Sequence, residues 1–329
     1  MEIHNTKTLT ISQLEQINNL WNSEFPVNLE GRFENLLDKV ENYNHYLIEE
    51  SNQVLAWAAV FEKDQEIRFS LIVKSSQQRR GLGTLLLNRL KRDLGEFYGW
   101  VIDHHDYVKQ NGELYNSPLS FYRKNGFEVL DDIRCDSELI NGVKIKNPVK
   151  VFAETERFIL REILPSDIDG MFELDSDPAV HQFLGNNSVS SVEQSIESIR
   201  YIRQQYIDHG IGRWAIIDKN TKEFVGWTGL KFITDNYNNH QNCYDLGYRL
   251  IKRYWGQGIA TETAIASVKY AFEKLDVDEI FAMTESENHS SQRILQKVGL
   301  RYVETFNHDG IQHNWFEISR RDYQNKKSS

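Results

Sequence analysis

Several features that mark other classes of protein are scarce in this sequence of 329 residues. Its 2 cysteines, Cys135 and Cys243, are too few for a disulfide framework and lack the spacing of metal ligands. The longest strongly apolar run, residues 54–61, is far shorter than the roughly 20 residues of a membrane-spanning helix. No basic and apolar leader opens the chain. These absences predict a cytoplasmic protein with reduced cysteines and no membrane association.

Basic residues are also too few for a nucleic-acid-binding surface. The chain has 38 Lys and Arg against 48 Asp and Glu, a formal net charge of −10. Nucleic acids and anionic membranes both require a basic face, so neither is expected as the main partner. The remaining composition, 40% hydrophobic and 26% charged with 5 prolines, is that of an ordinary globular protein. The length is about twice that of a usual single domain, which predicts two domains.

Two glycine-rich loops recur in the two halves of the chain. Gly81-Leu82-Gly83 and Gly256-Gln257-Gly258 stand 175 positions apart, and each follows an apolar run and opens a segment of helical periodicity. Further along, Gly126-Phe127 and Gly299-Leu300 stand 173 positions apart. Two landmarks at nearly one spacing indicate an internal duplication.

Each half predicts the same order of elements: a strand, one or two helices, an antiparallel run of strands, the glycine loop with its helix, a strand, a helix and final strands. Capping boxes mark two helix starts, Ser12-Gln13-Leu14-Glu15 and Ser191-Val192-Glu193-Gln194. Residues 131–151 predict a closing hairpin around Asn141-Gly142. The boundary therefore falls near residue 152, with domains of residues 1–152 and 153–329.

A strand, a glycine loop and a helix N-terminus together make an anion site. The first amides of a helix lack internal partners, the helix dipole adds positive charge, and glycine lets the backbone approach a phosphate. A dinucleotide fingerprint needs a third glycine, but Leu86 and Thr261 stand at those positions. A nucleotide P-loop needs Gly-Lys-Ser/Thr, which is missing. The loops therefore predict a phosphate-bearing cofactor held without a metal.

Both halves resemble the GNAT superfamily of acyl-CoA-dependent N-acyltransferases, whose pyrophosphate loop reads [Q/R]-x-x-G-x-[G/A]. The C-terminal half is similar to the branch that contains ribosomal-protein alanine N-acetyltransferases, and the N-terminal half matches the general pattern. The segments that carry the C-terminal resemblance are residues 154–161, 246–248, 255–262 and 288–300. In the N-terminal half they are Val73, the glycine loop and residues 121–127.

The resemblance implies an α+β fold of two tandem GNAT-like domains. Each would be a mixed, mostly antiparallel sheet with a splayed central strand pair, flanked by helices. It also implies acetyl-CoA as cofactor, with the pantetheine arm in the gap and the pyrophosphate on the loop. The implied cofactor-binding residues are Val73, Gln78, Arg79, Arg80, Gly81, Gly83 and Thr84 in the first half. In the second half they are Arg253, Gly256, Gln257, Gly258, Ile259, Ala260 and Asn288.

Acyl transfer to an amine needs a proton for the departing thiolate and a group that takes the proton of the amine. The resemblance places Tyr122 at the thiolate in the first half, where a core aromatic is the structural alternative. In the second half Leu295 stands at that place, and Ser291 is the candidate donor. Asn288 would contact the cofactor or simply cap a helix.

The base is less well marked. Asp245 stands where related enzymes often carry a carboxylate, and its alternative is a solvated acid at a strand start. In the first half, Asp103-His104-His105-Asp106 would supply a base, bind a metal or form an exposed polar loop. A water chain is a further candidate in either half.

These features together predict an acetyl-CoA-dependent N-acetyltransferase that works by direct attack of a primary amine. The acceptor would be a peptide N-terminus, an amino acid, a polyamine or an amino sugar. Two alternatives stay open: an enzyme with only one active half, and a non-catalytic acyl-CoA-binding sensor or interaction protein. The chain would be a monomer, with its halves as an intrachain pseudo-dimer, or a homodimer.

Overall fold

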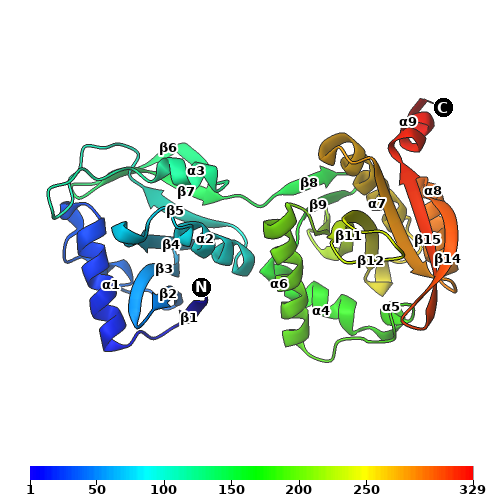
Figure 1. Ribbon diagram of the computed structural model, residues 1–329, viewed down its shortest axis with the longest axis horizontal. Coiled ribbons are helices and arrows are strands. Elements are labelled where there is room, and N and C mark those ends of the chain that lie inside the picture. Colours follow the sequence, from blue (N-terminus) through cyan, green and yellow to red (C-terminus); the bar gives the residue numbers. More distant parts are fainter. Residues whose placement is uncertain (329) are drawn as a thin grey trace. The chain divides into compact units, whose positions relative to one another are not determined.

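The computed structural model describes residues 1–328 and divides into two compact units, Met1–Pro148 and Val149–Ser329 (Figure 1). Each unit holds one sheet with helices on both faces. None of the helices in the described part of the chain combines the length and the apolar character that a membrane crossing requires.

The N-terminal unit has a sheet in the order β1-β2-β3-β4-β5-β7-β6. Its strands are β1 (Ile3–Thr6), β2 (Tyr43–Glu50), β3 (Gln53–Lys63), β4 (Glu66–Val73), β5 (Phe97–Val101), β6 (Glu128–Asp136) and β7 (Asn141–Asn147). Its helices are α1 (Ile11–Glu24), α2 (Leu82–Asp93) and α3 (Leu119–Lys124). Short 3-10 turns cover Val27–Leu29, Phe33–Leu36 and Ser75–Gln77.

The C-terminal unit has a sheet in the order β14-β15-β13-β12-β11-β10-β9-β8. Its strands are β8 (Val151–Glu154), β9 (Phe158–Glu162), β10 (Arg213–Asp218), β11 (Phe224–Ile233), β12 (Cys243–Leu250), β13 (Glu279–Glu285), β14 (Arg301–His308) and β15 (Ile311–Ser319). Its helices are α4 (Ile168–Ser176), α5 (Pro178–His181), α6 (Val192–His209), α7 (Ile259–Tyr270), α8 (His289–Val298) and α9 (Arg320–Ser328). The 3-10 turns Pro165–Asp167 and Lys252–Tyr254 and the π-helical segment Ala271–Leu275 complete it.

The centre of each sheet is splayed. Strands β4 and β5 are parallel and pair only at Arg68 and Tyr98, and β12 and β13 are parallel and pair only at Asp245 and Phe281. The antiparallel neighbours β3–β4 and β11–β12 stay in register along their whole length. The expected α+β fold of two mixed, mostly antiparallel sheets, each with a splayed central pair, is confirmed.

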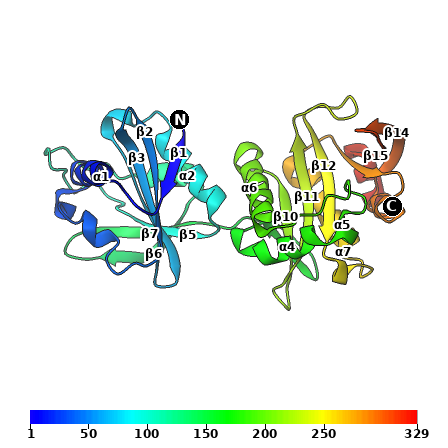
Figure 2. The same ribbon diagram turned by 90° about the horizontal axis from the view of Figure 1, so that it is seen from below.

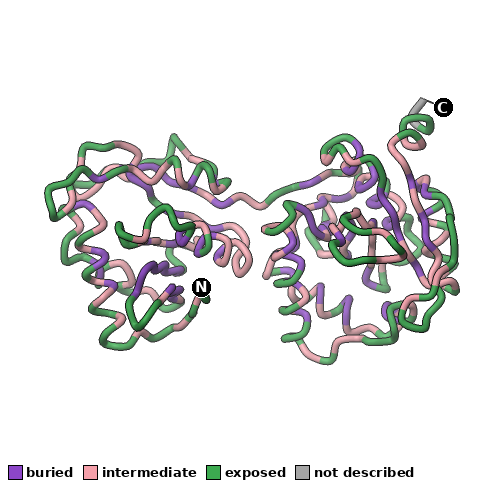
Figure 3. The backbone as a smooth tube through the Cα atoms, viewed as in Figure 1, coloured by how far each residue is buried: buried purple, intermediate pink, exposed green. Residues whose placement is uncertain are grey.

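Two apolar layers enclose each sheet, since its strands bury side chains on both faces. In the N-terminal unit α2 and α3 pack on one face and α1 on the other, and Figure 2 shows α1 and α2 on opposite sides of β2 and β3. In the C-terminal unit α7 and α8 cover one face and α4 and α6 the other. The buried stretches run mainly along the strands (Figure 3).

The unit boundary and one helix start differ from the sequence-based expectation. Val151 pairs with Arg161 in the second sheet, so residues 149–152 lie with the C-terminal unit and the expected closing hairpin ends at Asn147. Helix α1 starts one residue before Ser12, and Thr10 is its N-cap, with Gln13 completing the capping box. The capping box of Ser191 and Gln194 at α6 is confirmed.

We expect Gly226 to be the backbone position of the C-terminal sheet least able to accept a side chain. Its φ is +149°, and a Cβ there would lie 2.2 Å from the carbonyl oxygen of Arg249 on β12. Gly226→Ala should lower the free energy of unfolding by about 2–4 kcal/mol, measured by urea unfolding. Gly310→Ala is the control, because φ there is +85° with no atom within 4 Å, and about 1 kcal/mol is expected. Equal losses in the two variants would contradict the steric argument.

Candidate active site

Both glycine loops lead into helices that no side chain caps. Gly81 is the N-cap of α2 and Gly258 the N-cap of α7, with φ of 81° and 76°. A Cβ at Gly81 or at Gly256 would meet no atom within 4 Å. Each loop therefore presents open backbone and the unpartnered amides of a first helical turn, which is the donor set of an anion site.

The structure aligns the two loops two residues away from the expected register. The cap glycines Gly81 and Gly258 correspond, as do the turns Ser75–Gln77 and Lys252–Tyr254 before them. Positive φ falls at Arg79 (62°) and at Gly256 (75°), each two residues before its cap. The segment Gln78–Gly83 therefore matches Trp255–Ala260, and the matching Gly-x-Gly spelling in the sequence is a coincidence of neighbouring glycines.

This alignment places Arg253 outside the loop. Arg253 aligns with Ser76, pairs with Glu173 of α4 and lies 4.7 Å from the ring centre of Tyr254. Arg79, Arg80 and Gln257 are exposed on the loops themselves. The positive charge expected of Arg253 is thus partly neutralised by a carboxylate.

Arg157 is a loop-contacting residue that the sequence reasoning did not select. Its Nη2 donates to the carbonyl oxygen of Gln257 at 3.1 Å, and its Nε donates to Glu262 Oε2 at 2.7 Å. The guanidinium fixes the loop from outside and neutralises the acid in the first turn of α7. Arg157 lies in the segment 154–161, far in sequence from both glycine loops, so no sequence pattern indicated its contact with Gln257.

We call the point where the two parallel central strands of a sheet diverge, after their single residue pair, the fork of that sheet. Asp245 lies at the fork of the C-terminal sheet and is ion-paired. Its carboxylate accepts from the Arg213 guanidinium, and the side chains of Asp245 and Arg213 are only 14% and 12% exposed. Burial raises the pKa of Asp245, and the charge of Arg213 opposes that rise. The expected alternative, a solvated acid, does not describe this carboxyl group.

Gly247 makes room for the Arg213 side chain across the sheet. A Cβ on Gly247 would lie 2.7 Å from Arg213 Cζ, and Arg213 Nη1 donates at 2.7 Å to both Gly229 O and Asp245 O. Trp227 then stacks between two arginines, 5.2 Å from Arg213 and 5.0 Å from Arg249. Arg249 pairs in turn with Asp175 at 2.6 Å.

In the N-terminal unit Arg68 takes the place of Asp245 at the fork, because both are the parallel-paired residue of their strand. Arg68 pairs with Glu66 at 3.2 Å and with Asp64 at 2.8 Å. The two forks therefore carry opposite charges on their first strand.

Tyr122 is buried on α3, with its ring against Phe69, Phe121 and Phe127. Burial raises the pKa of its hydroxyl, so the phenol stays protonated. Leu295 occupies the same position on α8, since Phe127 N donates to Tyr122 O and Leu300 N to Leu295 O. The structure thus places Tyr122 in a core, close to the loop helix.

Ser291 and Asn288 lie together at the start of α8. Asn288 is the N-cap, and its Oδ1 accepts from Ser291 N at 3.1 Å. The Ser291 hydroxyl lies 3.0 Å from the hydroxyl of Tyr248 on β12. The capping alternative for Asn288 is therefore present, and Ser291 has a hydroxyl partner on the opposite strand of the gap.

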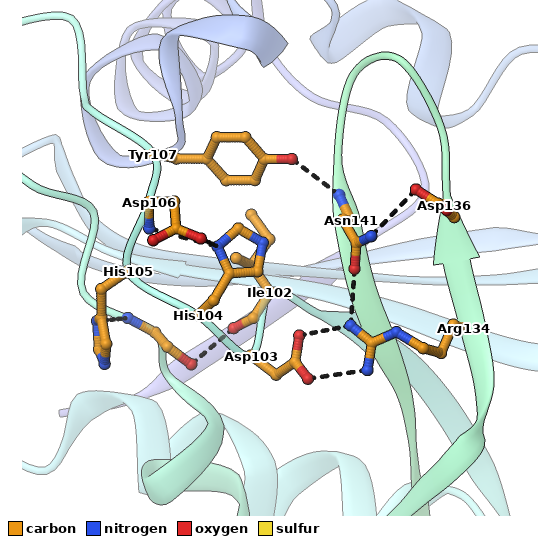
Figure 4. A network of polar contacts seen from close by, with 10 residues as sticks. Ile102, Asp103, His104, His105, Asp106, Tyr107, Arg134, Asp136 and Asn141 are labelled. Atoms are coloured by element: carbon orange, nitrogen blue, oxygen red, sulfur yellow. Dashed lines mark hydrogen bonds and ion pairs between the residues drawn. The ribbon is translucent and has the colours of Figure 1, made fainter.

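The Asp103 cluster of the N-terminal unit is a polar network of its own (Figure 4). Arg134 donates to Asp103 Oδ1 and Oδ2 at 2.9 and 3.0 Å, which lowers the pKa of that carboxyl group. His104 pairs with Asp106, and His105 Nδ1 accepts from Ser117 N at 3.3 Å. No group of three possible metal-ligating side chains occurs among the described residues. The lowered pKa makes Asp103 a poor base, whereas burial raises the pKa of Asp245 despite its ion pair.

Comparison with protein families places both units in the same class. A family model described as "Acetyltransferase (GNAT) domain" matches residues 157–301, and a second model with the same description matches residues 41–129.

Two curated relatives agree with this class. The uncharacterized N-acetyltransferase YoaA of Bacillus subtilis is 30% identical over 148 residues, covering 45% of this chain and 81% of its own length. The FsC-acetyl coenzyme A-N(2)-transacetylase of Aspergillus fumigatus is 30% identical over 138 residues, covering 41% of this chain and 58% of its own. A solved structure of RimL, a ribosomal L7/L12 alpha-N-protein acetyltransferase, in complex with coenzyme A has 17% identity and a TM-score of 0.44, covering 52% of this chain and 98% of that one.

We expect that breaking the ion pair of Asp245 with Arg213 makes the free energy of unfolding depend on pH. In Arg213→Gln the buried carboxylate loses its cation, which should cost about 3–5 kcal/mol of unfolding free energy at neutral pH. The pKa of Asp245 should then rise further above its unfolded value. Protonation therefore favours the folded state, and stability should recover as pH falls from 7.5 to 5. Urea unfolding at several pH values measures this, and Arg213→Gln with Asp245→Asn should lose the pH dependence. If Arg213→Gln lowers the free energy of unfolding equally at pH 7.5 and pH 5, the proposed coupling between Asp245 and Arg213 is refuted.

Proposed function

The chain belongs to the GNAT acetyltransferases and is an acyl-CoA-dependent N-acyltransferase, and we propose that its C-terminal unit transfers an acetyl group to a primary amine by direct attack. The acceptor would be a peptide N-terminus, an amino acid, a polyamine or an amino sugar. We choose the C-terminal unit because of the charge at the fork. The fork carries a carboxylate, Asp245, in the C-terminal unit and a cation, Arg68, in the N-terminal unit.

The cofactor of the family is acetyl-CoA, and the residues present fit it. A Cβ at Gly81 would meet no atom within 4 Å, and one at Gly258 would meet only Arg157 Nη2, at 4.0 Å. The first helical amides are not capped by side chains. The diverging central strands leave main-chain groups unpaired beside the gap, which suits an amide-containing arm. When bound, acetyl-CoA supplies an activated acetyl thioester.

The proposed cofactor residues follow from this fit. In the N-terminal unit they are Val73, Gln78, Arg79, Arg80, Gly81, Gly83 and Thr84. In the C-terminal unit they are Gly256, Gln257, Gly258, Ile259 and Ala260, with Asn288 at the far side of the gap and Arg253 beside the loop.

Asp245 is the proposed acceptor of the amine proton. Its carboxyl group lies at the fork, and one oxygen, Oδ2, is engaged by Arg213. Attraction to an ammonium group would bring the acceptor nitrogen to the same place. Burial raises the pKa of Asp245 and Arg213 opposes that rise, so Asp245 is a base of modest strength that serves amines of low pKa best.

Ser291 is proposed to belong to the hydroxyl groups that deliver a proton to the leaving sulfur in the C-terminal unit, and Tyr122 is the proposed proton donor for any reaction in the N-terminal unit. For the N-terminal unit, Arg68 at the fork and the ion pair of Asp103 with Arg134 favour cofactor binding without catalysis. A fork that carries a cation where the C-terminal unit has a carboxylate suits binding of acyl-CoA without transfer. The protein would then combine one catalytic and one cofactor-binding unit.

The cofactor sites are tested by acetyl-CoA calorimetry on loop variants. Asp tolerates positive φ, so Gly258→Asp should fold while its carboxylate repels the diphosphate. We expect at least roughly tenfold weaker binding at that unit, equivalent to about 1.4 kcal/mol. Gly258→Asn is the matched neutral control, and Gly81→Asp tests the other unit in the same way. Unchanged affinity in both Asp variants would contradict the loops as cofactor sites.

The acceptor class is tested by an amine panel with thiol release as readout. At pH 7, deprotonation costs about 1 kcal/mol for an α-amine but about 4–5 kcal/mol for a lysine-like amine. With a modest base, kcat/KM should favour α-amines at pH 7, and the preference should shrink towards pH 9.5. Binding of acetyl-CoA without turnover of any amine would instead support the sensor alternative.

A further inference from the structure

The two units exchange a leucine and a tyrosine across the same gap. In the N-terminal unit the strand residue is Leu71 and the helix residue is Tyr122; in the C-terminal unit they are Tyr248 and Leu295. All four side chains belong to the core that lies between the sheet and the loop helix of their unit. The aromatic ring therefore approaches this core from the helix in one unit and from the strand in the other.

The structural alignment supports this correspondence at both positions. Leu71 stands three residues after Arg68, and Tyr248 stands three residues after Asp245, the single parallel pairing of each fork. Tyr122 and Leu295 each accept, through their carbonyl oxygens, from the residue that follows the terminal glycine of the helix, at 3.1 and 2.9 Å. The exchange keeps the two residue types of each pair and moves the tyrosine, with its hydroxyl group, from the helix to the strand.

Tyr248 spans the gap of the C-terminal unit. It lies on β12 beyond the point where β12 and β13 separate, and its hydroxyl reaches α8, which follows β13. There it lies 3.1 Å from Ser291 O and 3.0 Å from Ser291 Oγ. Its hydroxyl thus lies beside the splayed strands and has a second hydroxyl in contact.

From this geometry we propose that Tyr248, supported by Ser291, is the proton donor to the leaving sulfur in the C-terminal unit. The inference rests on the proposed function, an acyl transfer in that unit. As the bond from the attacking nitrogen to the acyl carbon forms and the carbon–sulfur bond breaks, the sulfur keeps the electron pair of that bond. Tyr248 Oη then gives its proton to this sulfur, and Ser291 Oγ donates a hydrogen bond to the resulting phenolate. The proton released by the nitrogen passes to Asp245 or solvent, and solvent returns a proton to Tyr248.

Burial raises the pKa of Tyr248, and the hydrogen bond with Ser291 opposes that rise. The phenol is therefore protonated at any working pH and ready to donate. Ser291 alone would be a weaker donor, because an alkoxide is a stronger base than a phenolate. The hydroxyl groups of Tyr248 and Ser291 therefore supply a proton donor in a unit that has Leu295 on α8 where the other unit has a tyrosine.

The first test compares Tyr248→Phe with Tyr244→Phe. Tyr244 is on the same strand and the same face but at the paired end, where it packs 5.0 Å from Phe232. Tyr248→Phe should lower kcat by about 10²- to 10⁴-fold with little change in KM for acetyl-CoA, as for loss of a general acid. Tyr244→Phe should leave kcat unchanged. Equal kcat values in the two variants would overturn the inference.

The second test rebuilds the arrangement of the N-terminal unit. Tyr248→Leu should lose activity as Tyr248→Phe does, and Tyr248→Leu with Leu295→Tyr should regain at least roughly tenfold of it, because the hydroxyl returns from the helix side. Circular dichroism and urea unfolding verify that both variants fold. If the folded double variant shows no recovery, the exchange has no functional meaning.

The third test needs no turnover. In a Gly81→Asp background, binding of coenzyme A is measured by calorimetry between pH 7 and 9.5. A hydroxyl that donates to the sulfur stabilises the thiolate, so affinity should rise as pH passes the ordinary thiol pKa of about 8.5. Tyr248→Phe should remove this rise, and a desulfo analogue of coenzyme A should not show it. A rise that persists in Tyr248→Phe refutes the contact.

These outcomes separate the inference from the proposed function. If the unmodified chain binds no acetyl-CoA or acetylates no amine, the proposed function fails. If it does both and Tyr248→Phe behaves as Tyr244→Phe, only the role of Tyr248 fails. Loss of activity in Tyr122→Phe but not in Tyr248→Phe would assign the reaction to the N-terminal unit and overturn the inference.

Discussion

The divergence of two parallel strands after a single residue pair is the constraint on which the rest of each unit depends. Once β12 leaves β13 after Asp245 and Phe281, main-chain groups on both strands lack sheet partners. Strand β12 leads through the glycine loop into the N-terminus of α7. The unpaired main-chain groups of the strand and the uncapped amides of the helix therefore follow one another along the chain. Both need hydrogen-bonding partners, and a long cofactor with amides and a diphosphate supplies them.

Charge distinguishes the two forks more than shape does. Arg213 can reach Asp245 because Gly247 carries no side chain, since a Cβ there would lie 2.7 Å from Arg213 Cζ. The result is a buried carboxylate whose pKa is raised by burial and restrained by a cation. The N-terminal unit has an arginine at the same place, paired with two acids. A duplicated fold thus retains two cofactor-type loops while the groups that would face an acceptor have become opposite in charge.

The duplication also shows how a close-packed core limits divergence. An aromatic and an aliphatic side chain share the space between the sheet and the loop helix in each unit, and exchanging their positions conserves the total volume. Such an exchange leaves packing nearly intact but changes the direction from which a hydroxyl enters the gap. Conservation of volume therefore does not require conservation of the position of a polar group.

Local patterns in the sequence were enough for the glycine loops and the capping box of Ser191, since each depends on residues close together in the chain. Recurrence of such patterns indicated the duplication, and the resemblance to a known family implied the α+β class. Pairings between distant residues were decided only by the tertiary structure. The ion pair of Arg213 with Asp245 and the contact of Arg157 with Gln257 join segments that strand register brings together. Register also decided that Gly81 corresponds to Gly258 and not to Gly256, because the start of a helix, and not the spelling of a motif, determines which amides are free.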